Sequence, residues 1–439
     1  MNTPRKPGTA QAHNLRSTVQ LRLGADGIAL GELSFVQQSR RQFSVFAYQS
    51  SWLANSDRFE ISSDLPLTSG FQTRKASQNG DAVFHAAIAD TAPDAWGRRV
   101  IDRAHAKARR SNPARQPLTE LDYLCAVDDF SRVGALRLHR DGQYLGSTQG
   151  GERSTPPFIE LQRLYAATRA VETDQETAQD LAYLQGRGTS LGGMRPKCTL
   201  LDADGTLAIG KFPSISDGHN VTKAEVLALR LAAMAGIRTA QARCVSLDGV
   251  PVTVIQRFDR TADGKRIPYM SAATLIQAAR HEDRAYTEIV DALRIRGSQP
   301  LLDARELWRR MVVNLLITNT DDHLHNTGFL YDGAGRWRLS PAFDINPMPG
   351  KLRESKTWLS EDTGPIDSIA TLLDKSAYFA LNRAEAMKAL AAALAAISQW
   401  RELAASAGVG LTAGEQKALE DAFEHGQIDA ANALLKKGL

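Results

Sequence analysis

The stretch Asn319-Thr320-Asp321-Asp322-His323-Leu324-His325-Asn326 places Asp321 five positions before Asn326, directly after an apolar segment. A second carboxylate, Asp344, follows residues 327–339, where a short apolar strand, a glycine-rich turn and an alternating strand predict a β-hairpin. A hairpin returns the chain to its start, so we expect Asp344 beside Asn326. Kinase-type phosphoryl transfer needs an Asp that accepts or orients a hydroxyl proton, then an Asn and an Asp that hold Mg²⁺ at the ATP phosphates. Asp321 is thus the candidate catalytic residue, and Asn326 and Asp344 are the candidate metal ligands.

Two alternatives apply to this stretch. Polar residues of these types are common in the loop that ends a helix, so the Asp-to-Asn spacing alone is weak. His323 and His325, with the aspartates beside them, are also residue types that bind Zn or Mn. A second cluster of such ligands is missing elsewhere in the sequence. We therefore expect His323 to position the phosphates or the loop that carries Asp321.

A glycine-rich segment upstream is the candidate phosphate loop. Gly192 and Gly193 permit close backbone approach to phosphate and present N–H groups to it, and Lys197 follows as a mobile positive charge. The spacing matches neither a Walker A loop nor the G-x-G-x-x-G of protein kinases. A flexible connection is the alternative function for these glycines.

Lys211 stands near the end of an apolar strand predicted over residues 207–212. A strand lysine often faces solvent or protects a sheet edge, but here it is equally well placed for the α- and β-phosphates of ATP. Glu225, in the following predicted helix, could pair with it. Thr222 and Glu225 also have the spacing of a capping box, and both assignments stay open at this point.

Residues 256–260 end the last strand of this predicted lobe. In a kinase-like plan this segment, which includes Gln256 and Phe258, is the hinge, where backbone groups meet the adenine. Phe258 could instead be ordinary core, and Asp259 with Arg260 a surface pair.

Composition sets modest bounds on function. The chain has 439 residues, 43% hydrophobic content and a formal net charge of +4, which fits an ordinary globular protein of two or three domains. The three cysteines lie far apart in apolar runs, typical of buried thiols in a reducing compartment. The polar N-terminus lacks the apolar core of a signal peptide, and no apolar run has the length of a membrane span. We expect a soluble, cytoplasmic protein.

The order of patterns predicts an α+β, protein-kinase-like fold. A β-rich N-terminal subdomain precedes a Gly/Ser/Thr/Pro-rich linker, a small nucleotide-binding lobe with a hairpin and its lysine, and a mainly helical C-terminal lobe. The expected divisions are a disordered tail over 1–14, the N-terminal subdomain over 15–145, the linker over 146–157, the nucleotide-binding lobe over 158–268 and the catalytic lobe over 269–439.

Taken together, these motifs resemble the HipA family of serine/threonine-kinase toxins from bacterial toxin–antitoxin systems. The likeness spans most of the chain and rests on residues 189–197, 254–260, 319–326 and 339–344, with 95–99 and 132–136 in the N-terminal subdomain. It implies ATP and Mg²⁺ as cofactors. It also implies roles for single residues: Asp321 in catalysis, Asn326 and Asp344 on magnesium, and Gly192, Gly193, Lys197, Lys211, Gln256, Phe258 and His323 around ATP.

The resemblance further implies regulation and partners. Ser190 matches the serine that family members autophosphorylate, which ejects the phosphate loop and switches the kinase off. The N-terminal subdomain would help to dock a helix-turn-helix, HipB-like antitoxin, which carries most of the operator DNA contact. An aminoacyl-tRNA synthetase is the substrate that the family suggests. Gln256 stands where family members often carry Glu, which would alter the adenine contact.

Two other functions remain open on sequence grounds. The Asp-x-His-x-x-Asn pattern also resembles phosphatidylinositol kinases, so a lipid or small-molecule kinase is one alternative; no basic amphipathic helix or lipidation signal favours a membrane. A catalytically silent scaffold or co-repressor is the other, and the presence of all the expected catalytic and metal-binding residues argues against it.

Overall fold

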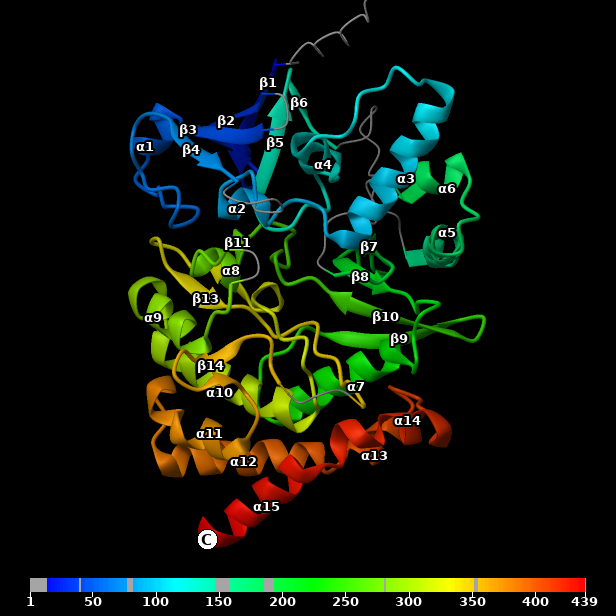
Figure 1. Ribbon diagram of the computed structural model, residues 1–439, viewed down its shortest axis with the longest axis vertical. Coiled ribbons are helices and arrows are strands. Elements are labelled where there is room, and N and C mark those ends of the chain that lie inside the picture. The colour runs from blue at the N-terminus through cyan, green and yellow to red at the C-terminus, as the bar shows by residue number, and fades with distance from the viewer. Residues whose placement is uncertain are drawn as a thin grey trace, which may run out of the picture.

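Figure 1 shows the computed structural model of the chain, which describes residues 14–38, 41–76, 82–146, 158–184, 193–279, 282–350 and 354–438. Nearly all of the expected tail and linker, together with Ser190 and Gly192, lie outside these ranges. The domain boundaries set from the sequence therefore stay predictions.

The N-terminal part is built on a six-stranded antiparallel sheet in the order β4-β3-β2-β1-β5-β6. Alternating apolar side chains such as Leu21, Leu33 and Phe46 are fully buried on its inner face, as half-buried strands require. The strands are β1 (Asn14–Leu23), β2 (Ile28–Gln38), β3 (Arg41–Tyr48), β4 (Gln72–Lys75), β5 (Leu136–Arg140) and β6 (Gln143–Tyr144). The helices of this part are α1 (Ser50–Leu53), α2 (Ala86–Ala89), α3 (Ala95–Ser111) and α4 (Glu120–Ala126).

A second sheet, in the order β7-β8-β10-β9, forms the nucleotide-lobe candidate. Its elements are η1 (Phe158–Glu160), α5 (Leu161–Glu172), α6 (Ala178–Leu184), β7 (Lys197–Leu201), β8 (Leu207–Lys211), α7 (Val221–Met234), β9 (Ala242–Leu247) and β10 (Val250–Gln256). In Figure 1, α7 lies along one side of this sheet and α5 on the other. Trp96 and Val100 of α3 share a buried cluster with Leu164 of α5 and Leu200 of β7. The helix α3 therefore packs into the core of this lobe.

The remaining chain is mainly helical, as predicted. Its sheet elements are β11 (Tyr269–Ser271), β12 (Gly328–Tyr331) and β13 (Trp337–Leu339), then β14 (Trp358–Ser360) and β15 (Gly364–Pro365). Its helices are α8 (Ala272–Leu275), α9 (Tyr286–Arg296), α10 (Pro300–Leu316), η2 (Leu324–Asn326), α11 (Ile369–Asp374), η3 (Ser376–Phe379), α12 (Arg383–Ile397), α13 (Trp400–Ala405), α14 (Ala413–Phe423) and α15 (Gly426–Gly438).

Local signals place several of these elements. The predicted hairpin forms, with β12 and β13 antiparallel. Asn382 and Thr412 each begin a helix with a complete capping box, as their spacing to Glu385 and Glu415 predicts.

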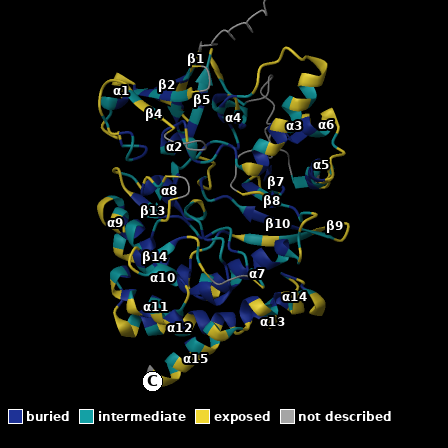
Figure 2. Cartoon of the chain, viewed as in Figure 1, coloured by how far each residue is buried: buried dark blue, intermediate teal, exposed yellow. Residues whose placement is uncertain are grey.

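Figure 2 shows α7 and α10 largely in the buried colour, which makes them the inner helices of the two lobes. Within the described ranges, no helix combines the length and apolarity needed to span a bilayer.

Hydrogen bonds connect the candidate hinge, residues 256–260, to the N-terminal part of the chain. Asp259 Oδ2 accepts a hydrogen bond from the Gly134 N–H at 2.7 Å and pairs with Arg260 Nη1 at 2.8 Å. The guanidinium of Arg260 also donates to the Arg132 carbonyl at 2.9 Å. Asp259 is only 3% exposed, so the alternative of a surface pair is wrong: Asp259 and Arg260 form a buried ion pair that contacts the N-terminal part of the chain.

Candidate active site

A largely buried lysine lies between two carboxylates at the end of β8. Lys211 Nζ is 2.6 Å from Glu225 Oε1 on α7 and 2.7 Å from Asp344 Oδ1, just after the β12–β13 hairpin. These side chains are 12%, 3% and 23% exposed, respectively. The cluster joins the strand of the small lobe, its helix and the following lobe at one point.

Electrostatic interactions favour the charged forms of Lys211 and Asp344 in this cluster. Burial alone would lower the pKa of Lys211, but the charges of Asp344 and Glu225 outweigh it and raise that pKa above its usual value. Burial likewise opposes ionisation of Asp344, yet Lys211 and Lys197 bring its pKa well below the usual range. For Glu225 burial prevails, and its pKa is raised.

The open question about Glu225 is settled by the start of α7. That helix is capped by Asn220, whose side chain accepts from the Lys223 N–H at 3.1 Å. Glu225 faces inward to Lys211, so the capping-box assignment for Thr222 and Glu225 is wrong and the ion pair forms.

Lys197 lies beside the end of the candidate phosphate loop. It is 4% exposed and is the cross-strand partner of Lys211 in the β7–β8 ladder. Its Nζ is 3.2 Å from Asp94 Oδ2, at the start of α3. Gly193 has φ +105°, and a Cβ built there would lie 2.8 Å from that Nζ. The structure therefore brings Gly193, Lys197 and Lys211 together.

The candidate catalytic Asp321 is accessible and held by a lysine. Its side chain is 37% exposed, so a substrate hydroxyl could reach it, and its Oδ1 pairs with Lys356 Nζ. The neighbouring Asp322 is buried and fixes the segment that carries this lysine. Asp322 Oδ1 accepts from the Lys356 N–H at 2.7 Å, and its Oδ2 accepts from the Tyr286 hydroxyl at 3.0 Å.

Asn326 and His323 complete the same loop. Asn326 Nδ2 donates to the Asp321 carbonyl at 2.8 Å, closing the turn. His323 lies where Asp321 and Asp344 both act on it, although burial dominates and lowers its pKa. The hydrogen bonds described for Asn326 and Asp344 do not join them to each other. Among the described residues, no three His, Cys, Asp or Glu side chains gather as a metal site of their own.

Of the two hinge candidates, Phe258 contacts a neighbour of this cluster. Phe258 packs against Phe343, the neighbour of Asp344, with ring centroids 5.5 Å apart. Gln256 pairs with Ala208 of β8, and its N–H donates to the Gln241 carbonyl at 2.9 Å. The structure thus brings Phe258 beside the candidate metal-binding segment.

Three features of the site fit ATP and Mg²⁺. Asn346 Oδ1 and His323 Nδ1 are buried polar atoms that lack a hydrogen-bond partner among the described residues, which is unfavourable unless a ligand or water satisfies them. Asn346 Nδ2 donates to Asp344 Oδ1 at 3.1 Å, so it belongs to this cluster. Asp344 itself has φ +54°, a strained conformation that often marks functional positions. One carboxylate and one amide suit Mg²⁺, which usually takes its other ligands from phosphate and water.

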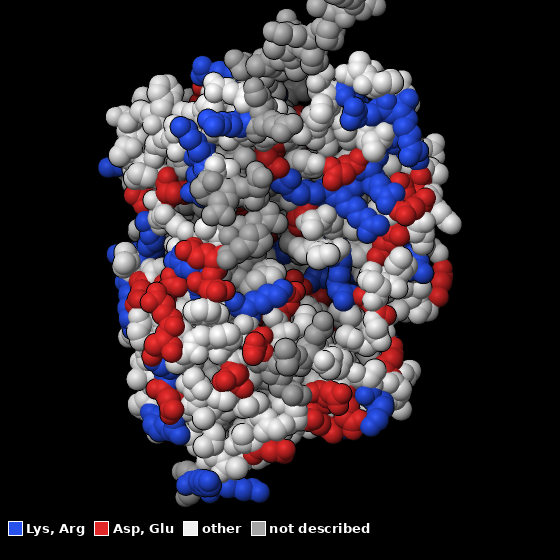
Figure 3. All heavy atoms as spheres, viewed as in Figure 1, with Lys and Arg blue, Asp and Glu red and all other residues white. Residues whose placement is uncertain are grey.

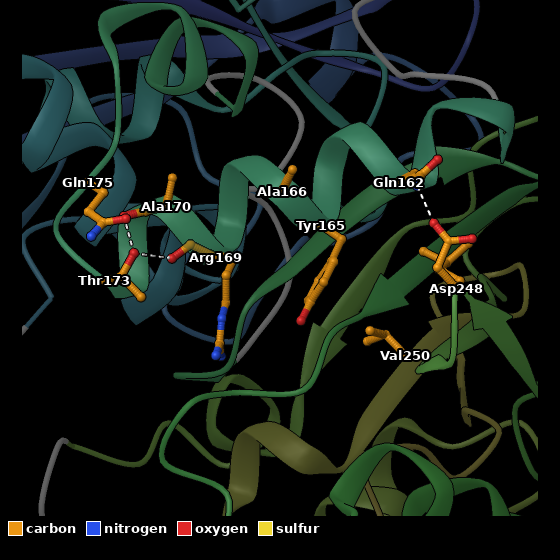
Figure 4. A pocket seen from close by; sticks show the side chains of 10 residues that line it. Gln162, Tyr165, Ala166, Arg169, Ala170, Thr173, Gln175, Asp248 and Val250 are labelled. Atoms are coloured by element: carbon orange, nitrogen blue, oxygen red, sulfur yellow. Dashed lines mark hydrogen bonds between the residues drawn. The ribbon is translucent and has the colours of Figure 1, made fainter.

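A pocket of about 450 Å³ lies elsewhere, between α5 and the β9–β10 turn. Figure 4 shows the Tyr165 and Arg169 side chains pointing into it, with Val250 opposite. None of its lining residues belongs to the cluster around Lys211. This pocket is therefore separate from the candidate active site.

Three residues of the site escaped the sequence interpretation: Asp94, Asn346 and Lys356. Pro93-Asp94 before a helical pattern is a recognisable N-cap signal, but the signal says nothing of Lys197, 103 positions later. Asn346 stands two residues after Asp344 and could have been included on proximity alone. The sequence around Lys356 contains no pattern that predicts its contact with Asp321.

Two family models match the chain. One, described as the HipA-like C-terminal domain, matches residues 189–407, and one described as the HipA N-terminal domain matches residues 22–139. The chain is also 27% identical over 184 residues to the candidate kinase Y4mE of Sinorhizobium fredii. That match covers 38% of this chain and 44% of the relative, less than half of its length.

A solved structure resembles almost the whole chain. It comes from the complex of HipA, HipB and operator DNA of the Shewanella oneidensis MR-1 toxin–antitoxin system. The TM-score is 0.63 at 15% identity, over 95% of this chain and 97% of that one. At this identity the likeness concerns the fold alone, and it confirms the predicted α+β, protein-kinase-like architecture.

Proposed function

The chain belongs to the HipA family of kinase toxins, and on that premise we propose that it is an ATP- and Mg²⁺-dependent serine/threonine-protein kinase. The observation that carries the proposal is the buried cluster in which Lys211 pairs with both Glu225 and Asp344. A kinase site needs a strand lysine paired with a helix glutamate, beside the aspartate that holds the metal. Bound MgATP would supply the transferable phosphoryl group.

The proposal assigns a role to each residue of the candidate active site. Asp321 accepts or orients the proton of the substrate hydroxyl, and its exposure leaves room for a protein side chain. Lys211 and Lys197, with the Gly193 backbone, bind the phosphates. Asn326 and Asp344 hold Mg²⁺, and His323 lies between the catalytic and metal-binding residues. Gln256 and Phe258 flank the adenine, a role supported by the packing of Phe258 on Phe343.

The proposal extends to regulation. Ser190 and Gly192, in the loop before Gly193, lie outside the described residues. A phosphoserine at Ser190 would add about −1.5 to −2 charges at pH 7 where the ATP phosphates are proposed to bind, so autophosphorylation would inhibit the kinase. Mass spectrometry of the wild type and of the Ser190→Ala variant after incubation with MgATP would test this.

Partners follow from the family. The S. oneidensis neighbour was solved with HipB and operator DNA, and we propose that this chain likewise binds a helix-turn-helix antitoxin in the cytoplasm. Operator DNA would be contacted mainly through the antitoxin. Figure 3 shows Lys and Arg side chains concentrated at the upper right, where Figure 1 places α3, and such a patch is suited to an acidic partner. An aminoacyl-tRNA synthetase remains the proposed substrate.

Labelled ATP tests the function. Purified wild type incubated with a cell lysate should place label in protein, and Asp321→Asn should lower the rate by roughly 10²- to 10⁴-fold. Asp332→Asn, an exposed Asp in the hairpin turn, serves as the matched control and should transfer normally. Label in lipid or in a small molecule would favour the alternative kinase classes. Equal label from wild type and Asp321→Asn would remove Asp321 from the catalytic role.

A further inference from the structure

The first turn of α3 meets the end of the candidate phosphate loop, although α3 belongs to the N-terminal part of the chain. The Trp96 N–H donates to the Gly193 carbonyl at 3.3 Å. Asp94 Oδ2 lies 3.2 Å from Lys197 Nζ, and both side chains are 5% exposed. Two separate contacts thus connect the start of α3 to this end of the loop, one to Gly193 and one to Lys197.

Lys197 needs a counterion at this place. It faces Lys211 across the β7–β8 ladder, so two like charges stand side by side in a buried strand pair. Lys211 already has Glu225 and Asp344. Burial lowers the pKa of Lys197, and the nearby Lys211 lowers it further, while Asp94 is the main group that opposes both effects. Asp94 is therefore the main partner of the Lys197 ammonium, although, unlike the two carboxylates around Lys211, it does not outweigh the effect of burial on the pKa.

Asp94 is itself held rigidly. Its Oδ1 accepts from the Gly97 N–H at 2.6 Å and so caps α3, which leaves Oδ2 facing Lys197. Trp96 is 1% exposed and anchors the helix in the core of the nucleotide lobe. Helix capping requires only one carboxylate oxygen, and Asn would serve equally well in that role. Capping therefore does not explain why Asp94 places a negatively charged Oδ2 beside Lys197.

The same short segment also touches the catalytic side. Asp90, four residues earlier, accepts from the Ser271 N–H at 2.7 Å and from its hydroxyl at 2.9 Å. Ser271 pairs with Gly328, directly after the loop that carries Asp321. Residues 90–94 therefore bridge the phosphate-binding side and the catalytic side of the site.

We propose that Asp94 is a positioning residue of the ATP site, which holds Lys197 beside Gly193 so that it meets the nucleotide phosphates. The N-terminal part of the chain thereby supplies one component of the phosphate site. This inference rests on the proposed function, because it takes ATP phosphate as the ligand of Lys197.

Calorimetry with MgATP and with adenosine tests the role. The Asp94→Asn variant keeps the helix cap and loses the charge, and Asp102→Asn, on the exposed side of the same helix, is its control. We expect Asp94→Asn to weaken MgATP binding about tenfold, the effect of one charge-assisted contact, while adenosine binding stays unchanged. In transfer assays the KM for ATP should rise by a similar factor, with kcat within about twofold.

A double-mutant cycle separates positioning from a general structural effect. In a Lys197→Met background, Asp94→Asn should cause no further loss of MgATP affinity, because the two residues act as one unit. Unchanged or tighter MgATP binding by Asp94→Asn, an equal loss for adenosine, or fully additive losses in the cycle would each overturn the inference alone. A wild type that binds no MgATP would overturn it together with the proposed function.

Discussion

Lys211 and Asp344 lie 133 positions apart in the sequence and are joined by an ion pair, with Lys211 Nζ 2.7 Å from Asp344 Oδ1. The pair joins the last residue of β8 to the segment that follows the β12–β13 hairpin. Glu225 holds the same ammonium from α7. Because one buried cation serves two carboxylates from different elements, the relative position of the two lobes is fixed where the phosphates are proposed to bind.

Removal of Lys211 should therefore affect stability as well as activity. Lys211→Met leaves the buried Glu225 and the half-buried Asp344 without their partner, and we expect a loss of about 3–5 kcal/mol in the free energy of unfolding. Urea denaturation would measure it. The double variant Lys211→Met/Glu225→Gln removes one of the unpaired charges and should recover part of the loss. A Lys211→Met protein as stable as wild type would contradict the described pairing.

Gly193 allows a test of the phosphate-loop end with a matched glycine. Gly193→Ala introduces a Cβ against Lys197 Nζ at positive φ, whereas Gly205, in the β7–β8 turn at φ +82°, faces open space. Both substitutions should cost about 1–2 kcal/mol from backbone strain. MgATP affinity, measured by calorimetry, should fall only for Gly193→Ala. Equal losses of affinity in both variants would assign the effect to strain alone.

Lys356 should matter for the chemical step. It pairs with Asp321, and Lys356→Met leaves that carboxylate without its fixed neighbour, so we expect kcat to fall between about 10- and 100-fold with little change in the KM for ATP. Lys375→Met is the control, since Lys375 pairs at the surface with Asp362. Steady-state kinetics at saturating substrate would measure both. A normal kcat for Lys356→Met would show that Asp321 is positioned without it.

Asp322 predicts a pH dependence of stability. Burial raises its pKa from 3.8 to about 6, against the hydrogen bonds from Lys356 and Tyr286. The folded-state pKa exceeds the unfolded value, so the stabilising contribution of Asp322 is complete below about pH 4 and is lost as the pH rises through about 6. Its size is about 3 kcal/mol. The unfolding free energy of Asp322→Asn minus that of wild type should rise by this amount between pH 4 and 7, and a flat difference would contradict the raised pKa.

Much of the fold followed from local patterns. The glycine turn of the hairpin and the capping boxes at Asn382 and Thr412 each act over a few positions, and the hairpin and both helix starts form as predicted. The pairing of Lys211 with Glu225 was one of two assignments because Thr222 offered an equally good local signal. Only tertiary packing decided between them.

The contacts that escaped prediction connect distant positions. Asp94 meets Lys197, and Lys356 meets Asp321, through helix packing and loop anchoring that no short spacing encodes. The alternative of a surface pair at Asp259 and Arg260 is wrong for the same reason: a polar pair after a strand is usually exposed, but here the N-terminal part covers it. The candidate catalytic loop was proposed from residue types, whereas the contacts that support it required the structure.

A crystal structure with Mg²⁺ and a non-hydrolysable ATP analogue tests the central claim most directly. Our account predicts phosphate oxygens within about 3 Å of Lys211 Nζ and Lys197 Nζ, and the metal on Asn326 and Asp344. A nucleotide bound instead in the pocket between α5 and the β9–β10 turn, with the Lys211 cluster untouched, would contradict it.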